Sequence, residues 1–280
     1  MRDVLSWWQA IVLGLVEGIT EYLPVSSTGH LILASSLLRL GHPETKEALD
    51  AYLVVVQGGA ILAVLFLYRS RVIQMVRGIL GRDPDGVRLA GNLALAFLPA
   101  AVAGVLLSRT IKAVLFSPWP VLAALAAGGV WMLWLDRRGA RGTRDVTAMS
   151  WQTALGIGIF QTLALWPGTS RSMVTIGGGA LLGLNMVAAA EFSFLLGLPT
   201  LGAACVHDLA GNLRHGGPSM FQQLGAAPMA VGFAVATVAA VLSVRWLVSF
   251  LTRHGLAPFG WYRLALSVAF AALILLGAIG

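Results

Sequence analysis

The sequence GLVEGITEYLPVSSTGH, at residues 14–30, places two glutamates, two serines and a histidine inside a strongly apolar region. A related polar stretch, GIFQTLALWPGTSRSMVT, follows at residues 158–175. Both lie in segments apolar enough to enter a bilayer, where ionisable side chains are costly to keep. Each cluster therefore indicates a functional site, and the repetition of the cluster decides how the chain is organised.

The composition is that of a membrane protein. Hydrophobic residues make up 58% of the 280 residues, charged residues 11%, and the mean hydropathy is +0.82. In soluble domains, roughly a quarter of all residues are charged. We therefore predict an all-α polytopic membrane protein whose residues 1–280 form a single integral membrane domain. The net charge of +7 comes largely from arginines in short loops, which set membrane orientation, so we expect no nucleic-acid partner.

Six apolar runs are long enough to form transmembrane helices of about 20 residues. They cover residues 49–68, 88–107, 117–135, 186–206, 227–250 and 261–280.

Two further apolar segments, 5–38 and 151–184, are broken near their centres by Pro24 and by Pro167–Gly168. Each half is too short to cross ~30 Å of hydrocarbon as a helix that rises about 1.5 Å per residue. We predict that both are re-entrant helix–loop–helix segments, which enter and leave the membrane on the same side. The alternative is a kinked helix that spans the full membrane.

The two halves of the chain resemble each other. Glu17 aligns with Gln161 at an offset of 144 residues, and Pro24 with Pro167 at an offset of 143. Each broken segment precedes three spans, and an odd number of spans inverts the second copy. We predict an inverted-topology repeat with units of about 1–140 and 145–280, and such repeats place the site at their interface.

Basic residues indicate the orientation. With both termini outside, ten arginines fall in or beside the inner loops 69–87, 136–150 and 251–260, against six basic residues in the outer segments. This excess predicts that the N- and C-termini lie outside the membrane.

Glu17 and Glu21 lie four residues apart, on one face of a helix. Two such acids repel each other unless one is protonated or a cation bridges them. We consider them candidate ligands of a divalent cation, partners for His30, or a general base. The alternative is a structural carboxylate or an ion pair with Arg171.

Ser26, Ser27 and His30 follow the Pro24 break. A serine beside an imidazole, with a carboxylate to orient the ring, forms an activated nucleophile. Ser27, His30 and Glu21 are therefore candidate catalytic residues, and Ser26 a candidate substrate-binding residue. The alternative is that the serines cap the second half-helix and His30 only packs.

The second cluster has the features of an anion site. Gly168 precedes Ser170, Arg171 and Ser172 at a helix start, where free N–H groups attract anions. The guanidinium of Arg171 can donate two parallel hydrogen bonds to a phosphate, and Thr175 lies one helical turn further. We predict that these four polar residues bind phosphate and that Arg171 is also catalytic. A salt bridge from Arg171 to Glu21 or Glu191 is the structural alternative.

These motifs, together with Gln57-Gly58 and the stretch from Glu191 to Pro199, resemble the bacterial undecaprenyl-pyrophosphate phosphatase family, also called bacitracin-resistance proteins. The likeness covers essentially the whole chain. Met173 departs from it, because many members have a small residue there. A second lipid-phosphatase superfamily matches superficially, but the chain lacks its downstream histidine and aspartate.

The resemblance implies hydrolysis of undecaprenyl pyrophosphate to undecaprenyl phosphate and inorganic phosphate. It places the protein in the bacterial cytoplasmic (inner) membrane, with the active site open to the periplasmic or outer face. This reaction recycles the lipid carrier for cell-wall synthesis and counters bacitracin. The resemblance also implies dependence on Mg²⁺ or Ca²⁺, with Glu17 and Glu21 as metal ligands. The nucleophile is left open between Ser27, His30 and water. We expect the polyprenyl pyrophosphate and membrane lipid as partners, with a homodimer as a candidate assembly.

A polyprenyl-phosphate transporter or flippase is the alternative function, because inverted repeats with re-entrant segments are typical of transporters. Phosphate release by the purified protein in detergent discriminates the two, since transport has no meaning there.

Overall fold

Helices account for nearly all of the chain in the computed structural model, which describes residues 5–40, 42, 44–115, 117–139, 142–214 and 218–277. These residues contain no named strand, in agreement with the predicted all-α class. The longer elements are α1 (Trp7–Thr20), α2 (Ser27–Leu37), α3 (Lys46–Val55), α4 (Gln57–Leu67), α5 (Arg69–Ile79), α6 (Pro84–Leu115), α7 (Pro118–Arg137), α8 (Trp151–Thr162), α9 (Arg171–Leu181), α10 (Met186–Arg214), α11 (Ala226–His254) and α12 (Ala257–Leu275). Short turns η1 (Val146–Ala148), η2 (Leu163–Leu165) and η3 (Phe221–Gly225) connect some of them.

The six predicted spans are confirmed, and the chain is a multi-pass membrane protein. Among the described residues, six helical stretches are long and apolar enough to cross a membrane: Lys46–Leu67, Pro84–Leu107, Pro118–Arg137, Met186–Arg214, Phe221–His254 and Ala257–Leu275. The first consists of α3 and α4, which meet at Val56. The last begins four residues before the predicted start at 261, and residues 278–280 lie outside the described part.

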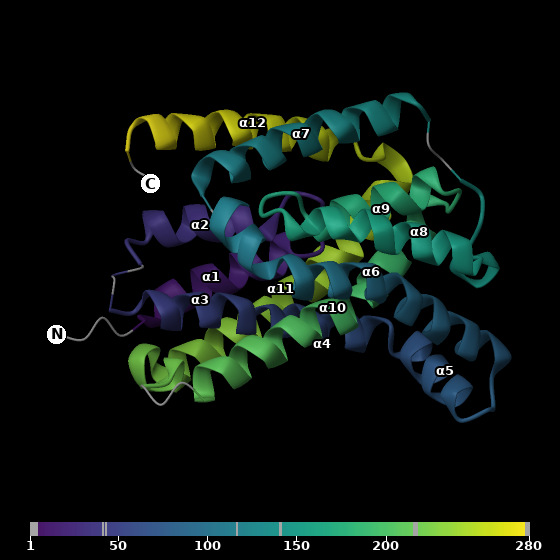
Figure 1. Cartoon of the computed structure of the whole chain (residues 1–280), viewed down its shortest axis with the longest axis horizontal. Coiled ribbons are helices and arrows are strands. Elements are labelled where there is room, and N and C mark those ends of the chain that lie inside the picture. Colours follow the sequence, from purple (N-terminus) through teal and green to yellow (C-terminus); the bar gives the residue numbers. More distant parts are fainter. Residues whose placement is uncertain are drawn as a thin grey trace.

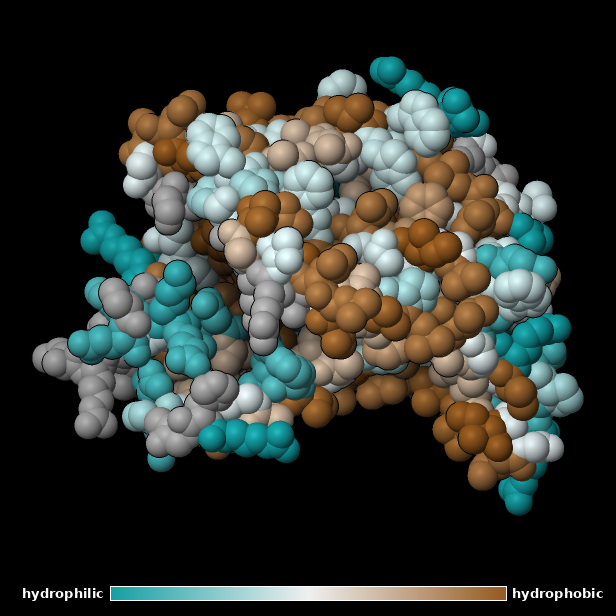
Figure 2. All heavy atoms as spheres, viewed as in Figure 1, coloured by the Kyte–Doolittle hydropathy of each residue, from teal (hydrophilic) through white to brown (hydrophobic). Residues whose placement is uncertain are grey.

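Apolar side chains dominate the middle of the molecule, and polar ones gather at its two ends (Figure 2). Large residues such as Val105 and Leu106 on α6 are 79% and 75% exposed. Such exposure is unfavourable in water and is expected of a surface that faces lipid.

Both predicted breaks are present, and their register corrects the sequence alignment. Ser6 caps α1 and Ser150 caps α8, 144 residues later. Ser26 caps α2 and Ser170 caps α9, again 144 residues apart, and both of these helices have 11 residues. Pro24 and Pro167 are 143 residues apart, so an alignment carried on from these prolines is one residue out at the caps. Counted from the caps, Arg171 has the position in α9 that Ser27 has in α2.

The two cap serines share an uncommon backbone conformation. Ser26 has φ 75° and Ser170 has φ 73°, in the left-handed region that non-glycine residues rarely adopt. Each hydroxyl accepts a hydrogen bond from a backbone N–H three residues on, at Gly29 and Met173. These caps set the direction in which each second half-helix leaves its break.

Close helix contacts also repeat. α1 packs on α11, where a Cβ at Gly14 would lie 2.2 Å from the Gly232 carbonyl oxygen. α8 packs on α6, where a Cβ at Gly158 would lie 2.5 Å from the Ala96 carbonyl oxygen. The helices α7 and α12 form a further pair, seen side by side in Figure 1. Glycine at these positions lets the backbones approach closely.

Candidate active site

Glu21 lies at the C-terminal end of α1, and its carboxylate connects the two breaks. Its Oε2 accepts a hydrogen bond from the Ser27 hydroxyl at 2.6 Å, and its Oε1 accepts one from Arg171 Nη2 at 3.0 Å. Ser27 and Arg171 are the first residues of α2 and α9. The two polar clusters predicted to face each other thus meet through direct contacts.

Arg171 makes further contacts inside this junction. Its Nη1 donates to the Ser193 carbonyl oxygen at 2.8 Å, and its guanidinium carbon lies 5.4 Å from the centroid of the Tyr22 ring. Its Nε is buried and has no hydrogen-bond partner among the described residues. The guanidinium also keeps N–H groups on Nη1 and Nη2 beyond those used in the contacts above, and guanidinium donors match phosphate geometry.

The structure decides between the two structural partners considered for Arg171. The partner is Glu21, because Glu191 instead accepts from Arg71 Nε at 2.6 Å. The Arg171 and Glu21 side chains are only 9% and 6% exposed. Removing one member of such a buried pair leaves an uncompensated charge.

His30 is not paired as predicted. Its Nδ1 lies 2.7 Å from the Ser26 carbonyl oxygen, and its Nε2 lies 2.7 Å from the Tyr262 hydroxyl. Both ring nitrogens are therefore engaged, and neither a carboxylate nor Ser27 is among their partners. The predicted Ser27–His30 dyad does not form here, because the Ser27 hydroxyl contacts Glu21 and His30 turns toward α12.

Three of the predicted phosphate-binding hydroxyls are buried and engaged by the protein. Ser26 caps α2, Ser172 donates to the Leu23 carbonyl oxygen at 2.9 Å, and Thr175 lies 2.6 Å from the Ser193 hydroxyl. Because these three hydroxyls are buried and already bonded to protein atoms, they are not placed to contact phosphate directly. Ser170 and Ser27, by contrast, are partly exposed.

Glu17 lies one helical turn before Glu21 and is fully buried. Both of its carboxylate oxygens lack hydrogen-bond partners among the described residues. Carboxylate oxygens are the ligands that Mg²⁺ and Ca²⁺ prefer, and Mg²⁺ often takes one or two carboxylates plus substrate phosphates. The described residues hold no group of three or more His, Cys, Asp or Glu side chains suited to a metal. The two glutamates therefore fit an ion whose other ligands come from substrate and water.

Sequence reasoning missed Tyr262, Arg263 and Ser193. Ser193 contacts both Arg171 and Thr175, whereas the other two reach the breaks from α12. Arg263 had a signal in the sequence, because a charge within an apolar span is rarely without function. Ser193 had one too, because it lies in the stretch from Glu191 to Pro199 that carries the family resemblance, whereas tyrosine at position 262 is ordinary in a membrane helix and gave no signal.

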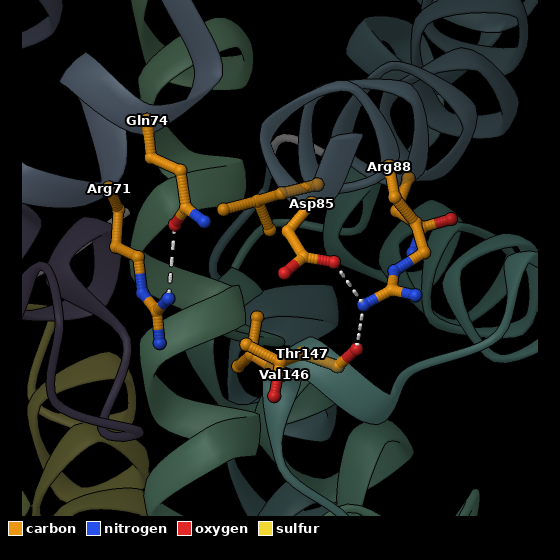
Figure 3. A pocket seen from close by; sticks show the side chains of 8 residues that line it. Arg71, Gln74, Asp85, Arg88, Val146 and Thr147 are labelled. Atoms are coloured by element: carbon orange, nitrogen blue, oxygen red, sulfur yellow. Dashed lines mark hydrogen bonds and ion pairs between the residues drawn. The ribbon is translucent and has the colours of Figure 1, made fainter. Parts of the chain in front are cut away.

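A small polar pocket lies elsewhere, between α5, α6 and η1 (Figure 3). Its arginines already have protein partners: Arg71 contacts Glu191 and Gln74, and Arg88 contacts Asp85 and the Thr147 carbonyl oxygen. None of the predicted site residues lines it.

All the site residues described above lie within the part of the chain that matches known proteins. A family model described as bacitracin resistance protein BacA matches residues 10–269. An undecaprenyl-diphosphatase of Sorangium cellulosum is 51% identical over 94% of this chain and 84% of its own length. An undecaprenyl-diphosphatase 2 of Rhodospirillum rubrum is 46% identical over 96% of each chain. One of Pseudomonas putida is 44% identical over 94% of this chain and 92% of its own.

Proposed function

The chain belongs to the bacitracin resistance protein BacA family, and we propose that it hydrolyses undecaprenyl pyrophosphate at the junction of its two breaks. The chain is an undecaprenyl-diphosphatase, a membrane hydrolase that releases undecaprenyl phosphate and inorganic phosphate. This activity returns the lipid carrier to cell-wall synthesis and confers bacitracin resistance. The observation that supports the site most directly is Glu21, which contacts the Ser27 hydroxyl and Arg171 at once.

In the first step, Ser27 is the nucleophile. Its hydroxyl donates to Glu21 Oε2 at 2.6 Å, a distance at which the carboxylate can accept the proton. The Ser27 oxygen forms a bond to the terminal phosphorus, and the bond from that phosphorus to the bridging oxygen breaks. Undecaprenyl phosphate leaves with the bonding electrons, and a phosphoserine remains.

In the second step, a water oxygen forms a bond to the phosphorus of the phosphoserine, and the bond from that phosphorus to the Ser27 oxygen breaks. Glu21 returns its proton to the Ser27 oxygen, and inorganic phosphate leaves. We assign the acceptance of the water proton to His30, which lies on α2 one turn beyond Ser27. Its Nε2 becomes available when the Tyr262 hydroxyl gives up its hydrogen bond.

The N-terminal turn of α9 binds the phosphate groups. Ser170 is partly exposed there, the first N–H groups of the helix have no partner within it, and Arg171 keeps N–H groups on Nη1 and Nη2 beyond those that contact Ser193 and Glu21. Donors held in place by protein contacts stabilise charge that develops on phosphate oxygens during transfer. Ser26, Ser172 and Thr175 act behind this surface, since their hydroxyls hold the breaks together.

Glu17 and Glu21 would hold Mg²⁺ or Ca²⁺, with substrate phosphates and water as the remaining ligands. The ion supplies positive charge that offsets the charge of the pyrophosphate.

We further infer that the two broken segments are re-entrant and that the chain is an inverted repeat. The common offset of 144, the matching caps and the paired α1–α11 and α8–α6 contacts support this. The start of α1 and the end of α12 lie toward one end of the molecule and the arginine-rich helix α5 toward the other (Figure 1). Since arginines favour the cytoplasmic side, we infer that the start of α1 and the end of α12 face outward, and we propose that the site opens to that side.

The catalytic assignment is tested with purified protein in detergent, by phosphate release from farnesyl pyrophosphate. Glu21→Ala and Arg171→Ala should abolish release, whereas Glu47→Ala, an exposed glutamate on α3, should leave it unchanged. Near wild-type turnover in either site variant would refute the assignment.

The orientation is tested by cysteine labelling in a Cys205→Ala background. Thr28 is exposed beside the site, and Arg82 is exposed in a predicted inner loop. In intact cells a membrane-impermeant maleimide should label Thr28→Cys, and it should label Arg82→Cys only after permeabilisation. The reverse pattern would show that the site faces inward.

A further inference from the structure

Two neighbouring residues of α12 reach different breaks. The Tyr262 hydroxyl lies 2.7 Å from His30 Nε2 of the first broken segment, and the two rings stack with centroids 5.7 Å apart and 3° between planes. Arg263 Nη2 donates to the Gly168 carbonyl oxygen of the second broken segment at 2.9 Å. One helix, last in the chain, therefore contacts both halves of the site.

Arg263 is fully buried and has only carbonyl partners. Besides Gly168, its Nη2 donates to the Ala124 carbonyl oxygen at 2.9 Å, and its Nε donates to the Leu125 carbonyl oxygen at 3.3 Å. No carboxylate lies within ion-pair distance of it in the described part of the chain. Its Nη1 is buried without a partner. A buried charge without a counterion is costly, so its retention requires a purpose.

The helix α7 is shaped to admit this guanidinium. A Cβ at Gly128 would lie 2.4 Å from Arg263 Nη2 and 2.8 Å from Met173 Sδ. Glycine at this position therefore leaves space for Arg263 to reach past α7 to the second break. Met173, on the far side of that space, is also the residue that departs from the family pattern.

Gly168 is where Arg263 acts on the anion site. Gly168 has φ 93°, and a Cβ there would lie 2.7 Å from the Val121 carbonyl oxygen, so only glycine fits without strain. The turn is pressed against α7 on one side and held by Arg263 through its carbonyl oxygen. Two residues later Ser170 begins the cap from which Arg171 extends, so the direction of this carbonyl sets where both residues point.

Arg263 also contributes charge. Arg171 is neutralised by Glu21, so that pair brings no net charge to an anionic substrate. Arg263 lies directly behind the same turn without a carboxylate partner. In the low dielectric of the protein interior, this positive charge attracts an anionic substrate bound at the turn more strongly than it would in water.

Tyr262 holds the ring of His30 in place through a hydrogen bond and a stacking contact. A carbonyl oxygen can only accept, so the contact with Ser26 places the His30 proton on Nδ1. When the ring is neutral, Nε2 accepts the Tyr262 hydroxyl hydrogen. Tyr262 is 47% exposed, so it lies at the edge of the site and can move when substrate enters.

We propose that Tyr262 and Arg263 form a clamp on α12 that positions the two halves of the site. Arg263 holds the Gly168 turn, and with it Ser170 and Arg171, while Tyr262 fixes the ring plane of His30. Neither residue touches the reacting atoms, so both are positioning residues. The proposal rests on the proposed phosphatase function.

The Arg263 half is tested with Arg263→Lys and Arg263→Gln, by phosphate release from farnesyl pyrophosphate and by inhibition with inorganic phosphate. A displaced anion turn should lower kcat/KM of both by about 100-fold, because small misplacements have effects of that size. The inhibition constant for phosphate should rise in both variants, and more in Gln, which lacks the charge. Ser267→Ala, one turn further on α12 and bonded only within that helix, is the matched control.

Wild-type kcat/KM and phosphate inhibition in Arg263→Gln would overturn this half. Lower activity at unchanged phosphate inhibition would also overturn it, since that pattern indicates general loosening rather than a displaced anion turn. Thermal unfolding in detergent identifies variants that fail to fold, and Arg263→Lys, which keeps the charge and most of the stem, then decides alone.

The Tyr262 half is tested by a double-mutant cycle with Tyr262→Phe and His30→Gln. Tyr262→Phe alone should lower kcat several-fold, and this loss should vanish in the His30→Gln background, because Tyr262 acts through His30. Trp261→Phe, 61% exposed on the same helix, is the control and should have no effect. An equal loss in both backgrounds would overturn this half. If the wild-type protein releases no phosphate, the proposed function fails, and the clamp fails with it; activity in the wild type with wild-type kinetics in all clamp variants refutes only the clamp.

Discussion

The Ser27 hydroxyl donates to Glu21 across 2.6 Å, although the sequence places His30 three residues away and Glu21 six. Ser27 begins α2, and Glu21 lies at the end of α1, so the break between the helices brings the two side chains together. Carboxylate rather than imidazole is therefore the base nearest the nucleophile, and the roles of the two residues can be separated experimentally.

Glu21→Gln should lower the rate of the first step by about 10²–10⁴-fold, the usual contribution of general-base catalysis. His30→Gln should instead slow the second step and let phosphoserine accumulate at Ser27. Mass spectrometry of acid-quenched protein after mixing with farnesyl pyrophosphate detects this species. Phosphoserine in Glu21→Gln but not in His30→Gln would reverse the two assignments.

Arg171→Met should destabilise the protein by about 3–5 kcal/mol, because it leaves Glu21 buried and unpaired. Adding Glu21→Gln to this variant should recover part of that loss, since the buried charge is then removed. Thermal unfolding in one detergent, at one protein concentration, measures both. Strictly additive destabilisation would mean that the two side chains do not interact.

Glu17→Gln should raise the Mg²⁺ concentration needed for half-maximal phosphate release, because one ligand loses its charge. Chelation with EDTA should abolish activity of the wild type, and added Mg²⁺ or Ca²⁺ should restore it. Glu47→Gln serves as the control for an exposed glutamate. An unchanged Mg²⁺ requirement in Glu17→Gln would exclude Glu17 as a ligand.

Gly14→Ala should destabilise the protein clearly, because its Cβ would lie 2.2 Å from the Gly232 carbonyl oxygen and force α1 from α11. Gly91→Ala is the matched control, since nothing lies within 4 Å of its added Cβ. The control should be neutral or stabilise by up to about 1 kcal/mol, as alanine favours helices. Equal melting temperatures in the two variants would contradict the packing described here.

Much of the fold was predictable, because a bilayer imposes few solutions. A run of about 20 apolar residues has to be a helix that satisfies its own backbone, so the six spans follow from hydropathy alone. Pro24 and Pro167–Gly168 marked the two breaks correctly, but proline alone did not require them, since Pro99 and Pro199 lie inside the continuous helices α6 and α10. The register of the repeat was less predictable, because one residue separates the offsets 143 and 144, and only the positions of the caps distinguish them.

Site chemistry divides in the same way. Residue types alone identified Glu17, Glu21, Ser27, His30 and Arg171 as candidates, since charge and hydroxyl groups are expensive in lipid and rarely accidental there. Their partners depended on tertiary structure. His30 contacts Tyr262, which lies 232 residues further along the sequence, and Gly168 contacts Arg263, which lies 95 residues further. No local sequence pattern specifies a contact between residues so far apart. Which side chains form a contact depends on the distance between them and on the direction in which each points. For these two pairs, only the position of α12 beside both breaks determines that distance and direction.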